Sequence, residues 1–294
     1  MRRLIYIFII GLLLCSYTWA DGSRYASKSL LSEGKWVKIR VDKTGIYKLS
    51  YADLKNMGFS DPSKVSVHGY GGWPLDEDFS KEYIDDVPST PVWRGSDYLL
   101  FYGKGPVKWE YDSSSQTFVH TNNPYSLYGY YFVTDATPTN DMTSVAQASG
   151  ATNRITTYDD YLVHEQELVS LAKSGRELYG EDFSGATPRT LSTFSSIPGI
   201  TNEDAKVTMS FVSKVTSGTG VASLSINQSN VLDVSIRSNR EEYVKALEGV
   251  STAVWKGEKS EKNSVVVSYN SASHNNVRLN YCLLYTSPSP RDAH

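Results

Sequence analysis

Cysteine is almost absent from this chain, which has two such residues among 294. Cys15 lies in an apolar N-terminal run, and Cys282 lies in the last stretch of the sequence. For reasons given below, we expect neither residue in the mature native protein. Residues 21–281 would then have no disulfide, no cysteine metal site and no cysteine nucleophile. Burial of apolar side chains must then stabilise their folded state, and about 260 residues suffice for one or two domains with a core.

A surplus of basic residues is also missing. The formal net charge is −3, and loss of Arg2 and Arg3 with a leader would make the remainder more negative. Proteins that bind nucleic acid carry strongly basic surfaces. The charge balance therefore speaks against nucleic acid as a partner.

Long apolar runs are missing except for residues 4–14, which follow a basic start and precede Thr18-Trp19-Ala20. Small residues at the −3 and −1 positions predict a secretory signal peptide over 1–20, and hence export. An uncleaved anchor is the alternative, although the run is short for a membrane span. A lipoprotein signal needs a small residue before its cysteine, whereas Leu14 precedes Cys15.

The sequence ends "YCLLYTSPSPRDAH" without a turn after the strand-like text that precedes it. Residues 282–294 resemble the conceptual translation of a sequencing adapter. We therefore expect a non-native tail over 282–294 and a native sequence that is cut at Tyr281. A genuine flexible terminus is the alternative. We expect residues 286–294 to leave the body as irregular, exposed chain. Deleting residues 282–294 should then cost little stability, within about 0.5 kcal/mol, unless Leu283 and Leu284 cover an unfinished sheet.

Tyrosine, with 21 residues, leads a composition rich in threonine, serine, valine and glycine, which is typical of antiparallel β structure. The sequence predicts a mainly β fold: two consecutive antiparallel β-sandwich or jelly-roll-like domains with short helices. Residues 136–153 lose their aromatics, so we place the boundary there. The predicted organisation is an N-terminal β-rich domain over 21–150 and a second, truncated β-sandwich over 151–281.

The stretch 34–58 is the clearest local pattern. Val37, Ile39 and Val41 share one strand face, and a turn at "DKTG" predicts a β-hairpin with residues 46–49. Ser50 is suited to cap a short helix that ends at Gly58. Residues 239–249, "NREEYVKALEG", predict either a short helix or a polar connection.

Histidine offers little sign of catalysis. "HEQEL" at 164–168 looks like part of a zinc-protease helix, but Leu168 stands where the second histidine ligand belongs. His68, His120 and His274 are dispersed beside strand or turn text, which favours structural roles. "GYGGW" at 69–73 lacks the Lys-Ser/Thr ending of a phosphate loop, so its glycines favour a tight turn or close backbone packing.

Two further patterns leave alternatives open. The acidic residues between 76 and 86 could hold calcium, but their spacing has no calcium-loop register. The tryptophans could form a sugar-stacking platform or, more often in strands, pack in the core or at an edge; they are Trp36, Trp73, Trp93 and Trp109. We assign no catalytic, cofactor-binding or metal-binding residue and expect no cofactor.

Four stretches, taken in order, resemble a known family: "GKWVKIRVDKTGIYKLSYADLKNMG", "SDYLLFYGKGPVKWEYD", "NPYSLYGYYFV" and "SGRELYGEDF". They are similar to the N-terminal region of PorU-type sortases of the type IX secretion system, within the gingipain family of cysteine peptidases. The resemblance covers residues 34–281. Leu178 departs from it, because tryptophan is expected in the Gly-Arg-Glu segment.

The resemblance implies that a peptidase domain with a His–Cys dyad follows the residues present here. In that domain a thiolate forms an acyl-enzyme, histidine handles the protons, and an amine or water resolves the intermediate. The whole protein would cleave the C-terminal signals of secreted cargo and attach the cargo at the outer surface of the cell. The implied partners are the downstream peptidase domain, outer-membrane type IX components and cargo proteins.

Because no mature cysteine remains, we expect residues 21–281 alone to have no peptidase activity. The alternative function is that of an exported, non-enzymatic β-sandwich adhesin or glycan-binding module, which the aromatic β-rich composition would also suit. A longer reading frame separates the two: a downstream histidine and cysteine in βα patterns favour the peptidase, and further sandwich modules favour the adhesin.

Overall fold

The computed structural model describes residues 25–78, 80–81, 84–146, 149–150, 152, 156, 158–171, 176–239, 246–272 and 274–286. The expected signal peptide and residues 287–294 of the expected tail lie outside this part of the chain. So do residues 240–245 of the segment 239–249, for which we expect a short helix or a polar connection. The prediction of a mainly β fold is confirmed, because the named strands pair antiparallel in several sheets. No helix among the described residues is both long and apolar enough to cross a membrane.

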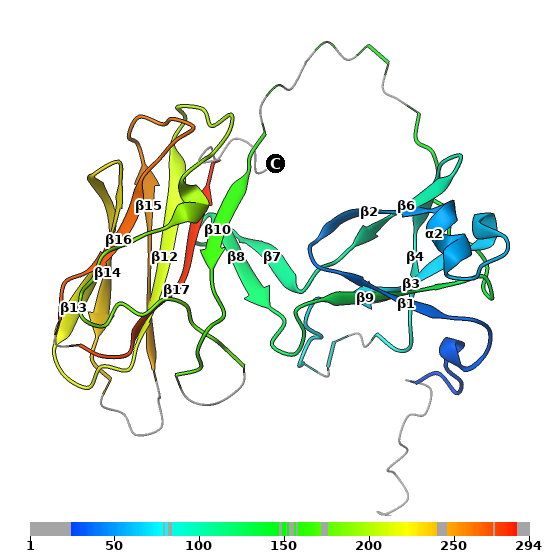
Figure 1. Ribbon diagram of the computed structural model, residues 1–294, viewed down its shortest axis with the longest axis horizontal. Coiled ribbons are helices and arrows are strands. Elements are labelled where there is room, and N and C mark those ends of the chain that lie inside the picture. The colour runs from blue at the N-terminus through cyan, green and yellow to red at the C-terminus, as the bar shows by residue number, and fades with distance from the viewer. Residues whose placement is uncertain are drawn as a thin grey trace, which may run out of the picture. The chain divides into compact units, whose positions relative to one another are not determined.

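The chain divides into two compact units (Figure 1). The first contains the residues up to Trp109 together with His120–Gln147, and the second contains Glu110–Val119 together with the residues from Ala148 onward. The tip of the hairpin formed by β7 (Val107–Asp112) and β8 (Thr117–Asn122) therefore belongs to the second unit. The boundary near residue 150 stays a prediction.

The first unit encloses its core between two small sheets. One sheet has the order β1 (Val37–Val41), β9 (Gly129–Thr134), β3 (Ser66–Gly71), β4 (Ser89–Thr90). The other has the order β2 (Gly45–Ser50), β6 (Tyr98–Gly103), β5 (Val92–Arg94). Val67 and Val133 from the first sheet meet Leu99 and Phe101 from the second in one buried cluster.

The predicted hairpin at 37–49 is wrong, although both of its strands exist. β1 pairs with β9, and β2 pairs with β6, so the two strands enter different sheets. The turn between them folds around the Tyr47 hydroxyl, which accepts from the Asp42 and Lys43 N–H groups and donates to the Lys43 carbonyl. Alternation predicts which face of a strand is buried, but it does not identify the strand's partner.

The predicted helix cap is confirmed. Helix α2 (Tyr51–Asn56) begins after Ser50, whose side chain accepts from the Asp53 N–H at 3.0 Å. Leu54 is fully buried, and Gly58 follows the helix at φ +90°, a conformation that glycine adopts without a Cβ clash. The described residues also form the short 3₁₀ helices η3 (Leu30–Ser32), η4 (Pro62–Lys64) and η5 (Ser192–Phe194).

Close backbone packing explains the "GYGGW" glycines, as predicted. A Cβ on Gly72 would lie 2.7 Å from the Gly129 Cα, and a Cβ on Gly105 would lie 2.6 Å from the Lys43 carbonyl carbon. Gly71 has φ +83° beside the Lys104 carbonyl. We call Gly71, Gly72, Gly105 and Gly129 the glycine crossing. Three chain segments meet there at distances that no larger residue allows.

The second unit is a β-sandwich of two four-stranded sheets (Figure 1). One has the order β10 (Tyr161–Glu165), β17 (Val277–Tyr285), β12 (Ala205–Ser213), β15 (Leu247–Trp255). The other has the order β11 (Arg189–Thr190), β16 (Val265–Tyr269), β13 (Thr219–Ile226), β14 (Ser229–Arg237). Alternate residues of these strands, such as Met209, Leu224 and Val267, are buried in one core.

Residues 282–285 belong to the fold, which is the case in which deleting residues 282–294 was expected to cost stability. They complete β17, and exposure falls to 1% for Cys282, 1% for Leu283 and 2% for Leu284. β17 is central in its sheet, so it pairs with β10 on one edge and with β12 on the other. Strand pairing on both sides and the apolar "CLL" sequence together bury this segment.

Candidate functional site

The three dispersed histidines each have a separate structural environment. His68 is buried in β3, where its Nε2 lies 2.8 Å from the Thr137 hydroxyl. His120 stacks on Trp109 with ring centroids 4.7 Å apart. His274 is buried, and its Nδ1 is hydrogen bonded to the Tyr269 hydroxyl. Each histidine thus packs against, or is hydrogen bonded to, a different neighbour, as structural histidines are.

The "HEQEL" segment is not a helix. His164 and Glu165 end strand β10, and Leu168 lies beyond it with 57% of its surface exposed. Nowhere in the described part of the chain do three or more His, Cys, Asp or Glu residues gather as a metal site. The segment therefore lacks both the helical spacing and the ligands of a zinc peptidase.

His164 instead belongs to a buried polar network that the sequence did not reveal. Its Nε2 lies 2.6 Å from Glu181 Oε1, and its Nδ1 lies 2.8 Å from Thr193 Oγ1. Burial is the largest single effect and acts to raise the pKa of Glu181. The hydrogen bonds from His164 and the backbone, together with the charges of His164 and Arg189, outweigh it and keep that pKa below its ordinary value. The partners are 17 and 29 residues away along the chain, so no spacing pattern could have indicated them.

This network has the order of an acid–histidine–hydroxyl relay, which raises the question of hydrolase chemistry. Thr193 lies on the exposed side of η5, and its hydroxyl faces the histidine. The open groove described next contains none of the three residues. A nucleophile needs space for a substrate beside it. We therefore assign the network a structural role, in which hydrogen bonds to His164 hold Glu181 and Thr193 against the edge strand β10.

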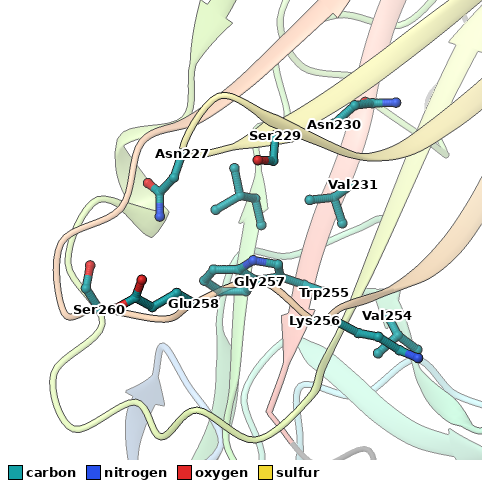
Figure 2. Close-up of a pocket in the computed structure, with 11 residues that line it drawn as sticks. Asn227, Ser229, Asn230, Val231, Val254, Trp255, Lys256, Gly257, Glu258 and Ser260 are labelled. Carbon is teal, nitrogen blue, oxygen red and sulfur yellow. The ribbon is translucent and has the colours of Figure 1, made fainter.

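An open groove of about 700 Å³ lies at one end of the sandwich (Figure 2). The β13–β14 turn forms one wall, and the end of β15 with the segment after it forms the other. In the view of Figure 2, Asn227 and Glu258 both lie to the left of the Trp255 ring. We call this the Trp255 groove.

The walls of the Trp255 groove are held by local hydrogen bonds. Asn227 and Gln228 both have positive φ, as a tight hairpin turn requires. The Asn227 side chain accepts from the Ser264 N–H at 2.9 Å and donates to Asn263 Oδ1 at 3.1 Å. These contacts fix the turn against the neighbouring loop, so the groove is preformed.

Trp255 is itself packed and only 4% exposed. Lys259 Nζ lies 4.9 Å from the centre of its ring, and burial lowers the pKa of this lysine by penalising the ammonium form. The groove thus offers amide, hydroxyl and carboxylate groups for hydrogen bonding over a covered aromatic floor. This arrangement suits reversible binding of a polar group. Its residues come from separate segments, which the sequence alone does not bring together.

The other tryptophans do not form a single platform through the contacts observed. Trp36 packs edge-on against His68, and Trp93 packs against Tyr98. Trp73 lies beneath Lys104 Nζ, 4.5 Å from the ring centre. Each ring packs against a different neighbour, as expected for core and edge packing.

Carboxylates of the acidic stretch bind other groups of the protein. Asp76 pairs with Lys81 at 2.6 Å, and this hydrogen bond lowers the pKa of the carboxyl. Asp86 accepts from the Leu30 N–H and the Ser29 hydroxyl. The carboxylates thus close a local turn and hold the segment around η3.

Cys282 faces His164 directly across the β10–β17 pair. The thiol is buried, and burial raises its pKa strongly because a thiolate would lose its water. A catalytic cysteine needs the opposite shift and access to a substrate. This His–Cys juxtaposition is therefore core packing and not a peptidase dyad.

Comparison with solved structures gives a strong likeness to a structure of PorU. The crystal structure of dimeric latent PorU from Porphyromonas gingivalis is 34% identical, with a TM-score of 0.76 over 90% of this chain. The chain spans 25% of the length of that PorU chain. An uncharacterized protein of Listeria monocytogenes EGD-e is 8% identical, with a TM-score of 0.27 over 85% of this chain and 19% of its own. The structure of infectious bursal disease virus Gx strain is 10% identical, with a TM-score of 0.26 over 90% of this chain and 76% of its own. These last two TM-scores carry no structural argument. No family model and no curated protein matches the chain.

Proposed function

We propose that this chain is the N-terminal, non-catalytic region of an exported, PorU-type cysteine endopeptidase and sortase. The carrying observation is the likeness to PorU, at 34% identity and a TM-score of 0.76 over 90% of the chain. The match spans 25% of the PorU chain, which leaves room in such a protein for a separate catalytic domain. The order of the four family-like sequence stretches supports the same assignment.

The described residues fit a supporting role in that protein. Their one free cysteine, Cys282, is buried with a raised pKa, and the Trp255 groove contains no residue of the His164 network. In the proposed protein, the cleavage of C-terminal cargo signals and the attachment of cargo at the cell surface belong to a downstream His–Cys domain. The proposed partners are that domain, outer-membrane secretion components and the cargo.

The test begins with the source DNA, read across codon 281 and onward. We expect a continuous frame that encodes further β structure and then a βα-patterned domain with a histidine and a cysteine. Expression of that complete frame should give a peptidase that thiol-directed inhibitors block, and replacing the downstream cysteine with alanine should abolish turnover. A frame that ends after more sandwich modules would favour the non-enzymatic adhesin and overturn the proposal.

A further inference from the structure

The Trp255 groove has polar side chains whose hydrogen-bonding capacity is unused. The Ser229 hydroxyl lies on the wall formed by the β13–β14 turn, and the Glu258 carboxylate lies on the other wall (Figure 2). Both residues are exposed. Among the described residues, neither side chain has a partner for a hydrogen bond or an ion pair. The groove therefore offers a hydroxyl that both donates and accepts, and a carboxylate that accepts.

The floor of the groove adds an unused donor. Trp255 is 4% exposed, and none of the described residues accepts a hydrogen bond from its indole N–H. In Figure 2 the indole nitrogen lies on the upper edge of the ring, toward the wall that carries Ser229. A covered indole N–H normally has an acceptor. An oxygen atom of a ligand in the groove would supply one.

Glycine at position 257 leaves this N–H within reach of a ligand. A Cβ on Gly257 would lie 2.8 Å from Trp255 Nε1, 3.4 Å from Cδ1 and 4.0 Å from Cε2, so it would stand in front of the N–H. The faces of the ring are covered by packing, and Lys259 Nζ lies 4.9 Å from the ring centre and donates to the Gly257 carbonyl at 3.3 Å. A ligand therefore meets the edge of the indole and not its face.

These groups restrict the chemistry of the ligand. The lining includes the ammonium of Lys256 and the carboxylate of Glu258, so an ion of either sign meets a like charge. Trp255 donates only and Glu258 accepts only, so the ligand must present both acceptors and donors. Uncharged hydroxyl groups do both, and two neighbouring hydroxyls can donate to one carboxylate. A groove of about 700 Å³ accommodates one or two sugar rings.

We propose that the Trp255 groove is a binding site for a neutral saccharide of one or two rings. Glu258 accepts hydrogen bonds from two neighbouring hydroxyls, and the Trp255 N–H and the Ser229 hydroxyl donate to oxygen atoms of the sugar. Val231 and Val254 contact its C–H groups. The sugar is bound and released unchanged. Because Trp255 does not offer its face for stacking, binding is weak, with a Kd of about 0.1–10 mM. The inference concerns the second unit alone and holds whether or not a catalytic domain follows.

Nuclear magnetic resonance of the purified full chain tests the site directly. The chain has six tryptophans, and the indole N–H signal of Trp255 is the one that Trp255→Phe removes. D-glucose, D-galactose, D-mannose, N-acetylglucosamine and lactose are titrated separately. We expect at least one of them to shift the Trp255 signal saturably, with a Kd in the range above, and to leave the other indole signals in place. Triglycine and sodium phosphate, which represent a peptide and an anion, should not shift the Trp255 signal.

Two variants test the individual contacts. Glu258→Gln should weaken sugar binding about tenfold, because an amide oxygen accepts less strongly than a carboxylate. Glu203→Gln, also at an exposed position, is its matched control and should bind like the wild type. Gly257→Ala should weaken binding at least about tenfold by covering the N–H. Gly45→Ala, where a Cβ meets nothing within 4 Å, is the control for that change.

Near-UV circular dichroism checks the packing of Trp255 in each variant, and Glu258→Gln lies at an exposed position that the fold does not depend on. Three outcomes would each overturn the proposal. They are a Trp255 signal that no sugar shifts at concentrations up to about 50 mM, a saturable shift with triglycine or phosphate in place of sugar, and wild-type sugar binding by Glu258→Gln.

Discussion

The two units fix their strands by different means. The longest described strands of the first unit have six residues, and its chain segments meet at the glycine crossing. In the second unit β12, β14, β15 and β17 each have nine residues, and alternate side chains fill a single core. Long alternation specifies a register because a one-residue slip exposes every core residue. The short strands of the first unit contain too few core residues to specify the register, so close backbone contacts at the glycine crossing specify it instead.

Side-chain contacts across strands reinforce this difference. In the first unit, Lys38 Nζ lies 3.8 Å from the Tyr130 ring centre and Lys48 Nζ lies 4.2 Å from that of Tyr98. These cations lie over rings of neighbouring strands and each contributes about 0.5–1 kcal/mol. Such contacts add local specificity to a fold that has little apolar alternation to rely on.

The strongest way to break the first unit alone is Gly129→Ala. Its Cβ would collide with the Lys104 carbonyl and lie 2.7 Å from the Gly72 N atom, and backbone cannot move aside as a side chain can. We expect a loss of at least about 4 kcal/mol in the free energy of unfolding of the first unit. Differential scanning calorimetry should show its transition shifted and that of the second unit retained.

Gly45→Ala is the matched control, because nothing lies within 4 Å of a Cβ at that position. It should melt within about 1 °C of the wild type, since an uninvolved surface change is nearly neutral. Equal melting of the Gly129 variant and the control would mean that the crossing does not fix the first unit.

The corresponding change in the second unit is Leu284→Ala. Leu284 is 2% exposed in the central strand, so its truncation leaves a cavity in the core and should cost about 3 kcal/mol. Urea denaturation measures the loss, and Leu168→Ala, at a 57% exposed position, is the control. A cost below about 0.5 kcal/mol would show that residues 282–285 do not pack as β17.

Acid should weaken the second unit through Glu181. Its folded-state pKa is lowered, so the stabilisation is complete above the ordinary carboxyl pKa of about 4.3 and is lost as the pH falls through the lower folded value. Glu181→Gln should cost about 1–2 kcal/mol at pH 7 and flatten the acid limb of the stability curve. Chemical denaturation from pH 2 to pH 7 measures the free energy of unfolding of the wild type and of the variant, and Glu203→Gln, at an exposed position, is the control. Parallel stability curves for the wild type and the Glu181 variant would contradict the prediction.

The smallest expected effect is at the cap of α2. Ser50→Ala removes the hydrogen bond to the Asp53 N–H and should cost the first unit about 1 kcal/mol. Ser50→Thr keeps the acceptor oxygen and should recover most of the loss. If threonine and alanine behave alike in thermal denaturation, the cap is not what begins this helix.

The sequence predicted features that depend on neighbours along the chain. Ser50 and Gly58 mark the ends of α2, and the alternation of Val37, Ile39 and Val41 identifies the buried face of β1. Both depend on local backbone geometry, which nearby residues determine. The "GYGGW" glycines likewise indicated close packing, although not the segments that they contact.

Features that depend on distant partners were missed. β1 and β2 looked like a hairpin, yet each pairs with a strand far along the sequence. His164 looked like a solvated residue because neither Glu181 nor Thr193 is near it in the sequence. The buried "CLL" of β17 could not be recognised either, because its burial depends on β10 and β12 lying on both sides.

The central position of β17 also determines the order in which the second sandwich can form. β10 and β12 are synthesised well before it, and the contact between Asp160 and Thr286 closes a separation of 126 residues. Until β17 emerges from the ribosome, both strands lack their shared partner, so this sheet cannot be completed segment by segment during translation. Contacts of such long range make folding slow. The second sandwich can therefore reach its complete form only after the last of its strands is present.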